Sequence, residues 1–185
     1  MNKHKLKVLF AGLVVLSMGC LAEKAQAAST DTITLSLTPS TTFAVTLTSV
    51  TAGVGYQFGS VNLNATTLST AAIIVTNTGS IYEYFALAVT NTSGGWTATS
   101  VPATTDTFRL SGLLNNTTQP LQGNGSFTAL TNVPPANGNG NYGQSAKTGP
   151  NETQNLWLQM ETPYSINTGG TGQQTMTLSV TGQAS

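Results

Sequence analysis

The chain has 185 residues, among them six basic and six acidic side chains, one histidine and one cysteine. The histidine, the cysteine and four of the six basic residues lie within the first 24 positions, which leaves only Arg109 and Lys147 as later basic groups. Most nucleophilic and acid–base mechanisms and most zinc sites lack their usual side chains here, and two cations cannot neutralise a row of phosphates. We therefore expect that the protein is not an enzyme, that it holds no metal or other cofactor, and that it binds no nucleic acid.

Residues 1–27 have the three parts of a secretory signal peptide. Lysines precede a short apolar stretch from Val8 to Ala22, and Ala25-Gln26-Ala27 places small residues at the two positions that a signal peptidase reads. The apolar stretch is shorter than the ~20 residues of a transmembrane helix. We expect cleavage after Ala27, no transmembrane segment, and a protein secreted to the exterior or to the cell surface of a bacterium.

The single cysteine raises a second interpretation of this leader. Ser17-Met18-Gly19-Cys20 resembles the lipobox at which bacterial lipoproteins are cleaved and anchored. A lipobox usually has leucine three residues before the cysteine, whereas this chain has Ser17. Because Ala25-Gln26-Ala27 is the better cleavage site, we expect Cys20 to be removed with the leader rather than lipidated.

Residues 28–185 have a length typical of one domain and carry a net charge of −3. They begin with a strand pattern, since Ile33, Leu35 and Leu37 alternate with Thr and Ser until Pro39 ends the run. Similar patterns predict further strands at 42–48, 57–63, 71–76, 84–91, 96–99, 107–114, 126–130, 156–160 and 173–181, with residues 71–75 forming a continuous apolar run typical of a strand covered on both faces.

Turn-forming residues separate these strands, as in Asn77-Thr78-Gly79 and Ser93-Gly94-Gly95. We find no amphipathic helical pattern after the leader. Nine or ten short strands in one chain of this length favour an all-β fold, a single β-sandwich of jelly-roll or Ig-like type. Without cysteine, such a domain depends on its sheets and core for stability.

One segment, residues 131–155, is too rich in Gly, Asn and Pro for a strand of normal length. Loops this long are usually functional or disordered. The segment is therefore interpreted either as a flexible surface insertion or as a binding or assembly loop.

Two acids and two aromatic residues are the remaining candidates for chemistry. Glu83 and Glu161 lie within or beside predicted strands, but nothing places them together as glycoside hydrolysis requires, and Glu83 reads equally well as a solvated residue beside a turn. Trp157 alternates out of phase with its apolar neighbours, and Tyr142 lies in the Gly/Asn-rich segment. Either ring could stack on a sugar, with Tyr142 the better candidate for an exposed ring, while a core position is the other reading of Trp157.

The residues from Tyr56 to Leu63, followed by Ile73 to Ser80, form a Gly-containing segment that leads to an apolar strand and an Asn-Thr-Gly turn. This pattern resembles secreted bacterial Ig-like and TasA/camelysin-type sandwich domains. The resemblance covers roughly 25 residues of simple chemistry. It implies a jelly-roll-like subunit of a surface structure or matrix fibre, and we transfer no functional residues from it.

These observations favour a secreted, non-enzymatic structural protein, a subunit of an extracellular filament, matrix or surface layer that associates with itself or with other surface proteins. The alternative is a carbohydrate-binding or adhesin-type module. For assembly, the first strand is the candidate: Ile33, Leu35 and Leu37 can pair within their own domain or complete the sheet of a neighbouring copy.

Overall fold

The computed structural model describes residues 34, 36–48, 55–115, 118–123, 126–131, 142–144, 147–167 and 170–184. The leader, Cys20, Ile33 and Leu35 lie outside these residues. The chain divides into two compact units, Met1–Pro39 and Ser40–Ser185. In the first unit, the described residues 34 and 36–39 are exposed and belong to no strand.

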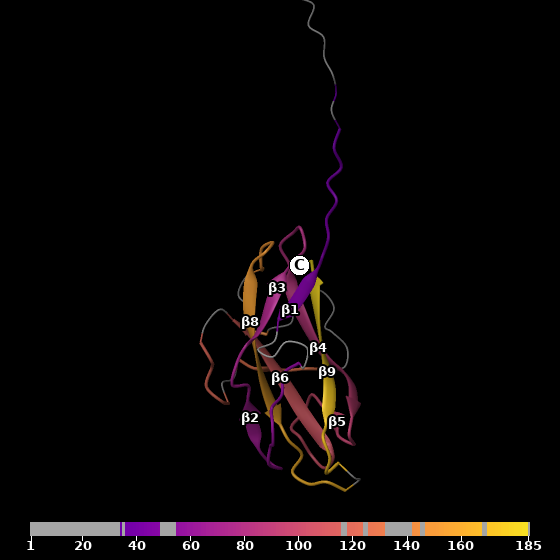
Figure 1. Cartoon of the computed structure of the whole chain (residues 1–185), viewed down its shortest axis with the longest axis vertical. Helices are drawn as coiled ribbons and strands as arrows, with labels where there is room; N and C mark the ends of the chain where they lie inside the picture. Colours follow the sequence, from indigo (N-terminus) through magenta and orange to yellow (C-terminus); the bar gives the residue numbers. More distant parts are fainter. Residues whose placement is uncertain are drawn as a thin grey trace, which may run out of the picture. The chain divides into compact units, whose positions relative to one another are not determined.

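The second unit is all-β: among its described residues there are nine strands and no helix (Figure 1). Eight of the strands coincide with predicted ones, and their bounds differ from the prediction by a few residues at most. The nine strands are β1 (Val45–Thr48), β2 (Thr66–Leu68), β3 (Ile73–Asn77), β4 (Tyr84–Ser93), β5 (Thr97–Ala98), β6 (Thr107–Asn115), β7 (Thr128–Ala129), β8 (Thr153–Glu161) and β9 (Thr175–Gln183).

The strands form two sheets. The larger one has the order β1-β3-β8-β6-β5, with β2 also paired to β8 and β7 to β6. Its pairs are antiparallel except β5 with β6. The smaller sheet consists of β4 and β9, which pair antiparallel from Tyr84 opposite Gln183 to Thr90 opposite Thr177.

The core lies between these sheets, as alternation along each strand dictates. Leu156, Leu158 and Met160 of β8 belong to the buried core cluster, together with Phe85, Leu87 and Val89 of β4. Gly112 of β6 permits a close approach, because a Cβ there would lie 2.7 Å from Cδ1 of Leu87. The fold is therefore the predicted all-β sandwich.

Two predicted strands are wrong where the structure describes them. Residues 57–63 form no strand: Gly59 has φ of 72°, which interrupts an extended chain. Tyr56 and Phe58 still pack against the core, with ring centroids 5.0 Å apart. In the predicted strand at 32–38, the described residues Thr34, Ser36, Leu37 and Thr38 have no strand partner, and Leu37 is 91% exposed.

The Gly/Asn/Pro-rich segment is shorter than predicted and in part well packed. β8 already begins at Thr153, and Thr148 is buried in an isolated antiparallel bridge with Glu83. Tyr142 is also buried. The interior of the segment, residues 132–141 and 145–146, lies outside the described residues.

Candidate functional site

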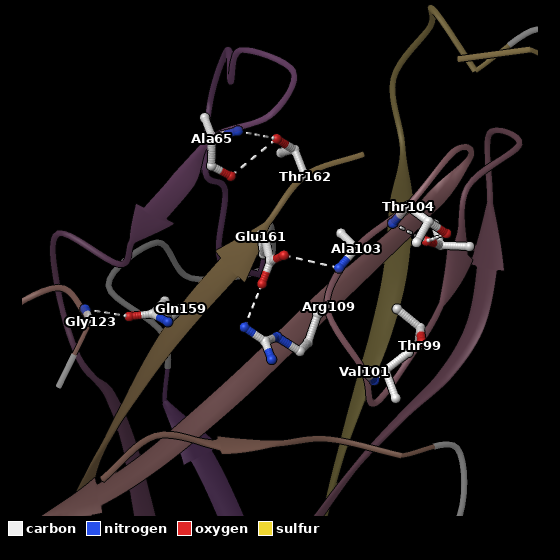
Figure 2. Close-up of polar contacts among 11 residues, drawn as sticks. Ala65, Thr99, Val101, Ala103, Thr104, Arg109, Gly123, Gln159, Glu161 and Thr162 are labelled. Atoms are coloured by element: carbon white, nitrogen blue, oxygen red, sulfur yellow. Dashed lines mark hydrogen bonds and ion pairs between the residues drawn. The ribbon is translucent and has the colours of Figure 1, made fainter. Parts of the chain in front are cut away.

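Arg109 and Glu161 form an ion pair on the larger sheet (Figure 2). They lie directly opposite each other on β6 and β8, and Nη2 of Arg109 is 2.5 Å from Oε2 of Glu161. The second carboxylate oxygen, Oε1, accepts a hydrogen bond of 2.9 Å from the backbone N–H of Ala103. Glu161 thus fastens the segment between β5 and β6 to the end of β8.

This arrangement of Arg109 and Glu161 is better suited to fixing the backbone at Ala103 than to catalysis. Both side chains are largely covered, with 30% of Arg109 and 23% of Glu161 exposed, and each satisfies the charge of the other. Nearby side chains of the same strand act similarly: Oε1 of Gln159 accepts the Gly123 N–H at 3.0 Å (Figure 2). The end of β8 is therefore a cluster of contacts that anchor loops.

Glu83 lies in an entirely different environment. Its side chain is completely buried, and neither carboxylate oxygen has a hydrogen-bond partner. The carboxylate rests against the backbone of Gly182 in β9, where a Cβ would collide with it. Burial raises the pKa of the Glu83 carboxyl, and the backbone of Ala44 opposes that rise only in part. The interpretation of Glu83 as a solvated residue beside a turn is wrong.

The two candidate carboxylates lie far apart. Glu83 bridges to Thr148, whose carbonyl oxygen accepts from Asn77, and Asn77 in turn donates to Glu152 just before β8. Glu161 is the last of the nine residues of β8. At ~3.3 Å per residue the strand is roughly 26 Å long. Glycosidase carboxyl groups are about 5–9.5 Å apart, so these two acids form no such pair.

Asn77 organises the buried polar region around Glu83. Its Nδ2 donates to the carbonyl oxygens of Ile81 and Thr148, both at 2.8 Å, and its Oδ1 accepts the Gly79 N–H at 2.8 Å. The last contact is the predicted Asn-Thr-Gly turn, in which the asparagine side chain bonds the backbone two residues on. All three side-chain hydrogen bonds of Asn77 therefore fix the backbone of the neighbouring segments.

Neither predicted stacking residue presents an exposed ring. Tyr142 is 3% exposed, and its hydroxyl donates to the carbonyl oxygen of Leu87 at 2.9 Å. The expectation that Tyr142 is an exposed ring is wrong, because the ring fills the core. Trp157 is 7% exposed and lies on the outer face of its sheet, opposite Leu113. Its indole N–H has no hydrogen-bond partner, and its core-facing neighbours are Leu156 and Leu158.

The exposed aromatic side chains lie at separate places. Tyr82 and Tyr164 are 61% and 57% exposed. Tyr82 precedes Glu83, near the beginning of β8, whereas Tyr164 follows the end of that strand. Within the described residues, no three His, Cys, Asp or Glu side chains are grouped as a metal site, and no helix there is long and apolar enough to cross a membrane.

Comparisons with known proteins add no assignment. No protein-family model matches the sequence, and no curated protein matches it significantly.

One signal for the burial of Glu83 is present in the sequence. Glu83 is in phase with Phe85, Leu87 and Val89, so a strand extended by one residue would direct it into the core. No periodic signal precedes Tyr142, since a lone ring among Gly and Asn residues has no pattern to orient it. Its position depends on a contact with β4, more than 50 residues away.

Proposed function

We propose that this protein is a secreted, non-enzymatic structural protein of a bacterium, a subunit of an extracellular filament, matrix or surface layer. The observation that carries the proposal is the state of the segment around Leu37. This amphipathic segment has strand periodicity, yet its described residues are exposed and belong to no strand, and a separately compact unit begins at Ser40.

The exposure of Leu37 is unfavourable in an isolated molecule. Leu37 leaves 91% of its side chain in water, and full burial of a leucine contributes about 1.5–3 kcal/mol. Pairing with the sheet of another copy would bury such side chains and satisfy the backbone groups of the segment. Pro39 separates the segment from the following strand, so the segment can pair elsewhere without distorting β1.

The buried chemistry agrees with this proposal. The fold is stabilised by the ion pair or hydrogen bonds that the polar side-chain atoms of four residues make, namely Arg109, Glu161, Asn77 and Tyr142. The alternative, a carbohydrate-binding or adhesin-type module, draws on exposed rings, of which Tyr82 and Tyr164 are candidates at separate places.

Electron microscopy of the exported protein at rising concentration tests the proposal. A structural subunit forms ordered polymers with a constant repeat. A protein that stays monomeric at high concentration, and whose Tyr82→Ala or Tyr164→Ala variant loses binding to a polysaccharide, is instead the binding module.

A further inference from the structure

β9 is an outermost strand of the smaller sheet. It pairs antiparallel with β4, Gly182 opposite Phe85, and with no other strand among the described residues. The backbone groups of the odd-numbered β4 residues point away from β9, since the Phe85 N–H donates to Oε1 of Gln144 at 3.0 Å and the Val89 N–H to the Thr131 carbonyl oxygen at 2.9 Å. The ladder between the two strands is therefore formed by the even-numbered residues of β4 and the odd-numbered residues of β9.

Four residues of β9 consequently direct their N–H and C=O groups to the open side of the strand: Met176, Leu178, Val180 and Gly182. Within the part of the chain that the structure describes, these outward groups have no hydrogen-bond partner. The four residues are half-buried rather than fully covered, and the side chains of the first three pack against the core. This side of β9 is therefore an accessible sheet edge that lies directly beside apolar side chains.

β9 lacks the features with which proteins usually protect such an edge, namely charged residues, proline, bulges or a short strand. It has nine residues, none of them charged and none of them proline, and its pairing with β4 is regular from Thr177 to Gln183. The outer edge of β4, by contrast, is covered by hydrogen bonds from or to Tyr142, Gln144 and Thr148. In the larger sheet, β1, β2 and β5 have only four, three and two residues.

We propose that two copies of this protein associate through β9, which pairs antiparallel with the β9 of the other copy about a two-fold axis at Ser179. In this register Met176 lies opposite Gly182 of the other copy, and Leu178 lies opposite Val180. Each outward residue thereby exchanges two backbone hydrogen bonds with an outward residue, and the two small sheets join in the order β4-β9-β9-β4. The inference goes beyond the proposed function, since it defines a contact between copies that does not involve the segment around Leu37.

Charge favours a second copy as the partner. Residues 28–185 carry a net charge of −3, but β9 carries no charged side chain, so two copies meet along this edge without like charges opposite each other. The strand is also complementary to itself. On the core side apolar Leu178 faces Val180, and on the outer face Thr177 faces Thr181, two pairings of the kind that stabilise antiparallel strands. A single strand pair is smaller than a standard stable interface, so the dimer is expected at high protein concentration.

Single cysteines test this register, because the only cysteine of the chain, Cys20, belongs to the leader. Ser179→Cys places two thiols opposite each other at the two-fold axis, where paired Cα atoms lie about 4.5 Å apart, within the range of a disulfide. Thr177→Cys is the matched control on the same face of the strand. Its two thiols are four positions out of register, about 13 Å apart, and cannot form a bond.

Under oxidising conditions at high protein concentration, non-reducing gels and mass spectrometry should show disulfide-linked dimers of the exported Ser179→Cys protein. Thr177→Cys alone should give at least about tenfold less, whereas a mixture of Thr177→Cys and Thr181→Cys should form the mixed disulfide. A Ser179→Cys protein that stays monomeric, or that crosslinks no faster than Thr177→Cys, overturns the inference. Polymers in which Ser179→Cys forms no such disulfide would overturn this inference while the proposed function stands.

A pair of double variants tests the same register without a covalent bond. Thr177 and Thr181 are both exposed and lie on the outer face, so charges there leave the core intact. Thr177→Lys with Thr181→Lys places like charges opposite each other twice, whereas Thr177→Lys with Thr181→Glu places opposite charges there. Both are made together with Leu37→Asp, so that the contact proposed around Leu37 does not contribute. At low salt, sedimentation equilibrium should give the double-lysine variant a dimer dissociation constant roughly tenfold or more above that of the lysine–glutamate variant. Equal dissociation constants would overturn the inference.

Discussion

Glu83 is predicted to make the domain less stable as the pH rises. The folded state raises the pKa of this carboxyl by burial, so between the ordinary value of 4.5 and the higher folded value the native protein retains a proton that the unfolded chain has lost. Stability is therefore fully present at acid pH and decreases with rising pH through that window. For one proton the slope is about 1.4 kcal/mol per pH unit.

Glu83→Gln removes this dependence with little change of shape. The neutral amide is similar in size to the protonated acid and fits against Gly182, so the unfolding free energies of the variant and the wild type are expected to be similar at acid pH. At neutral pH the variant is expected to be more stable, by about 1.4 kcal/mol for every unit by which burial raises the pKa.

Urea unfolding followed by tryptophan fluorescence measures this effect, because Trp96 and Trp157 are the only tryptophans and both are buried. The control is Glu152→Gln: Glu152 is exposed and its carboxylate accepts the Gly149 N–H at 2.7 Å, so the variant keeps Glu83 and the wild-type slope. A wild-type protein whose stability rises from acid to neutral pH, or a Glu83→Gln variant with the unchanged slope, would refute the assignment of a buried, unpaired carboxyl.

Two further substitutions separate backbone-fixing groups from surface charge. Asn77→Ala removes three side-chain hydrogen bonds in a buried region, and we expect it to lower the free energy of unfolding in urea by roughly 2–4 kcal/mol. A decrease of less than about 1 kcal/mol would contradict the role of Asn77 in fixing the backbone. Glu161→Gln breaks the ion pair with Arg109 but keeps an oxygen that can accept the Ala103 N–H. We therefore expect the free energy of unfolding to fall by about 1 kcal/mol or less, and the difference to shrink in high salt. A larger decrease that does not depend on salt would contradict this interpretation of the ion pair.

Sequence periodicity predicts much of this fold because most strands have one apolar face. β3, β4, β6 and β8 appear where alternation or continuous apolar runs predict them, and Asn77-Thr78-Gly79 forms the predicted turn. Alternation also occurs at 57–63, where Gly59 with its positive φ prevents a strand, and the apolar side chains pack without a ladder. The local sequence pattern identifies which side chains of a segment pack in the core, whereas backbone pairing with another strand depends on the rest of the chain.

The site was harder to predict because its members come together only in three dimensions. The edge of β4 is covered by Tyr142, Gln144 and Thr148, which follow it by about 55–65 residues and lie in a segment without periodicity. From composition alone, the polar side chains of such a segment are predicted to be exposed to solvent. Here they are held against a strand edge that otherwise would have unsatisfied backbone groups.

The most direct test of the central claim, that the segment around Leu37 joins one subunit to the next, is the comparison of Leu37→Asp with Ser36→Asp. Both residues are exposed within their own chain, so neither change should unfold the domain, and both add the same charge. In an extended strand the two side chains point to opposite faces, so only position 37 is buried on docking. Electron microscopy with sedimentation of the exported proteins should show that Leu37→Asp abolishes polymers while Ser36→Asp retains them. Polymers of unchanged repeat and yield from Leu37→Asp would contradict the claim.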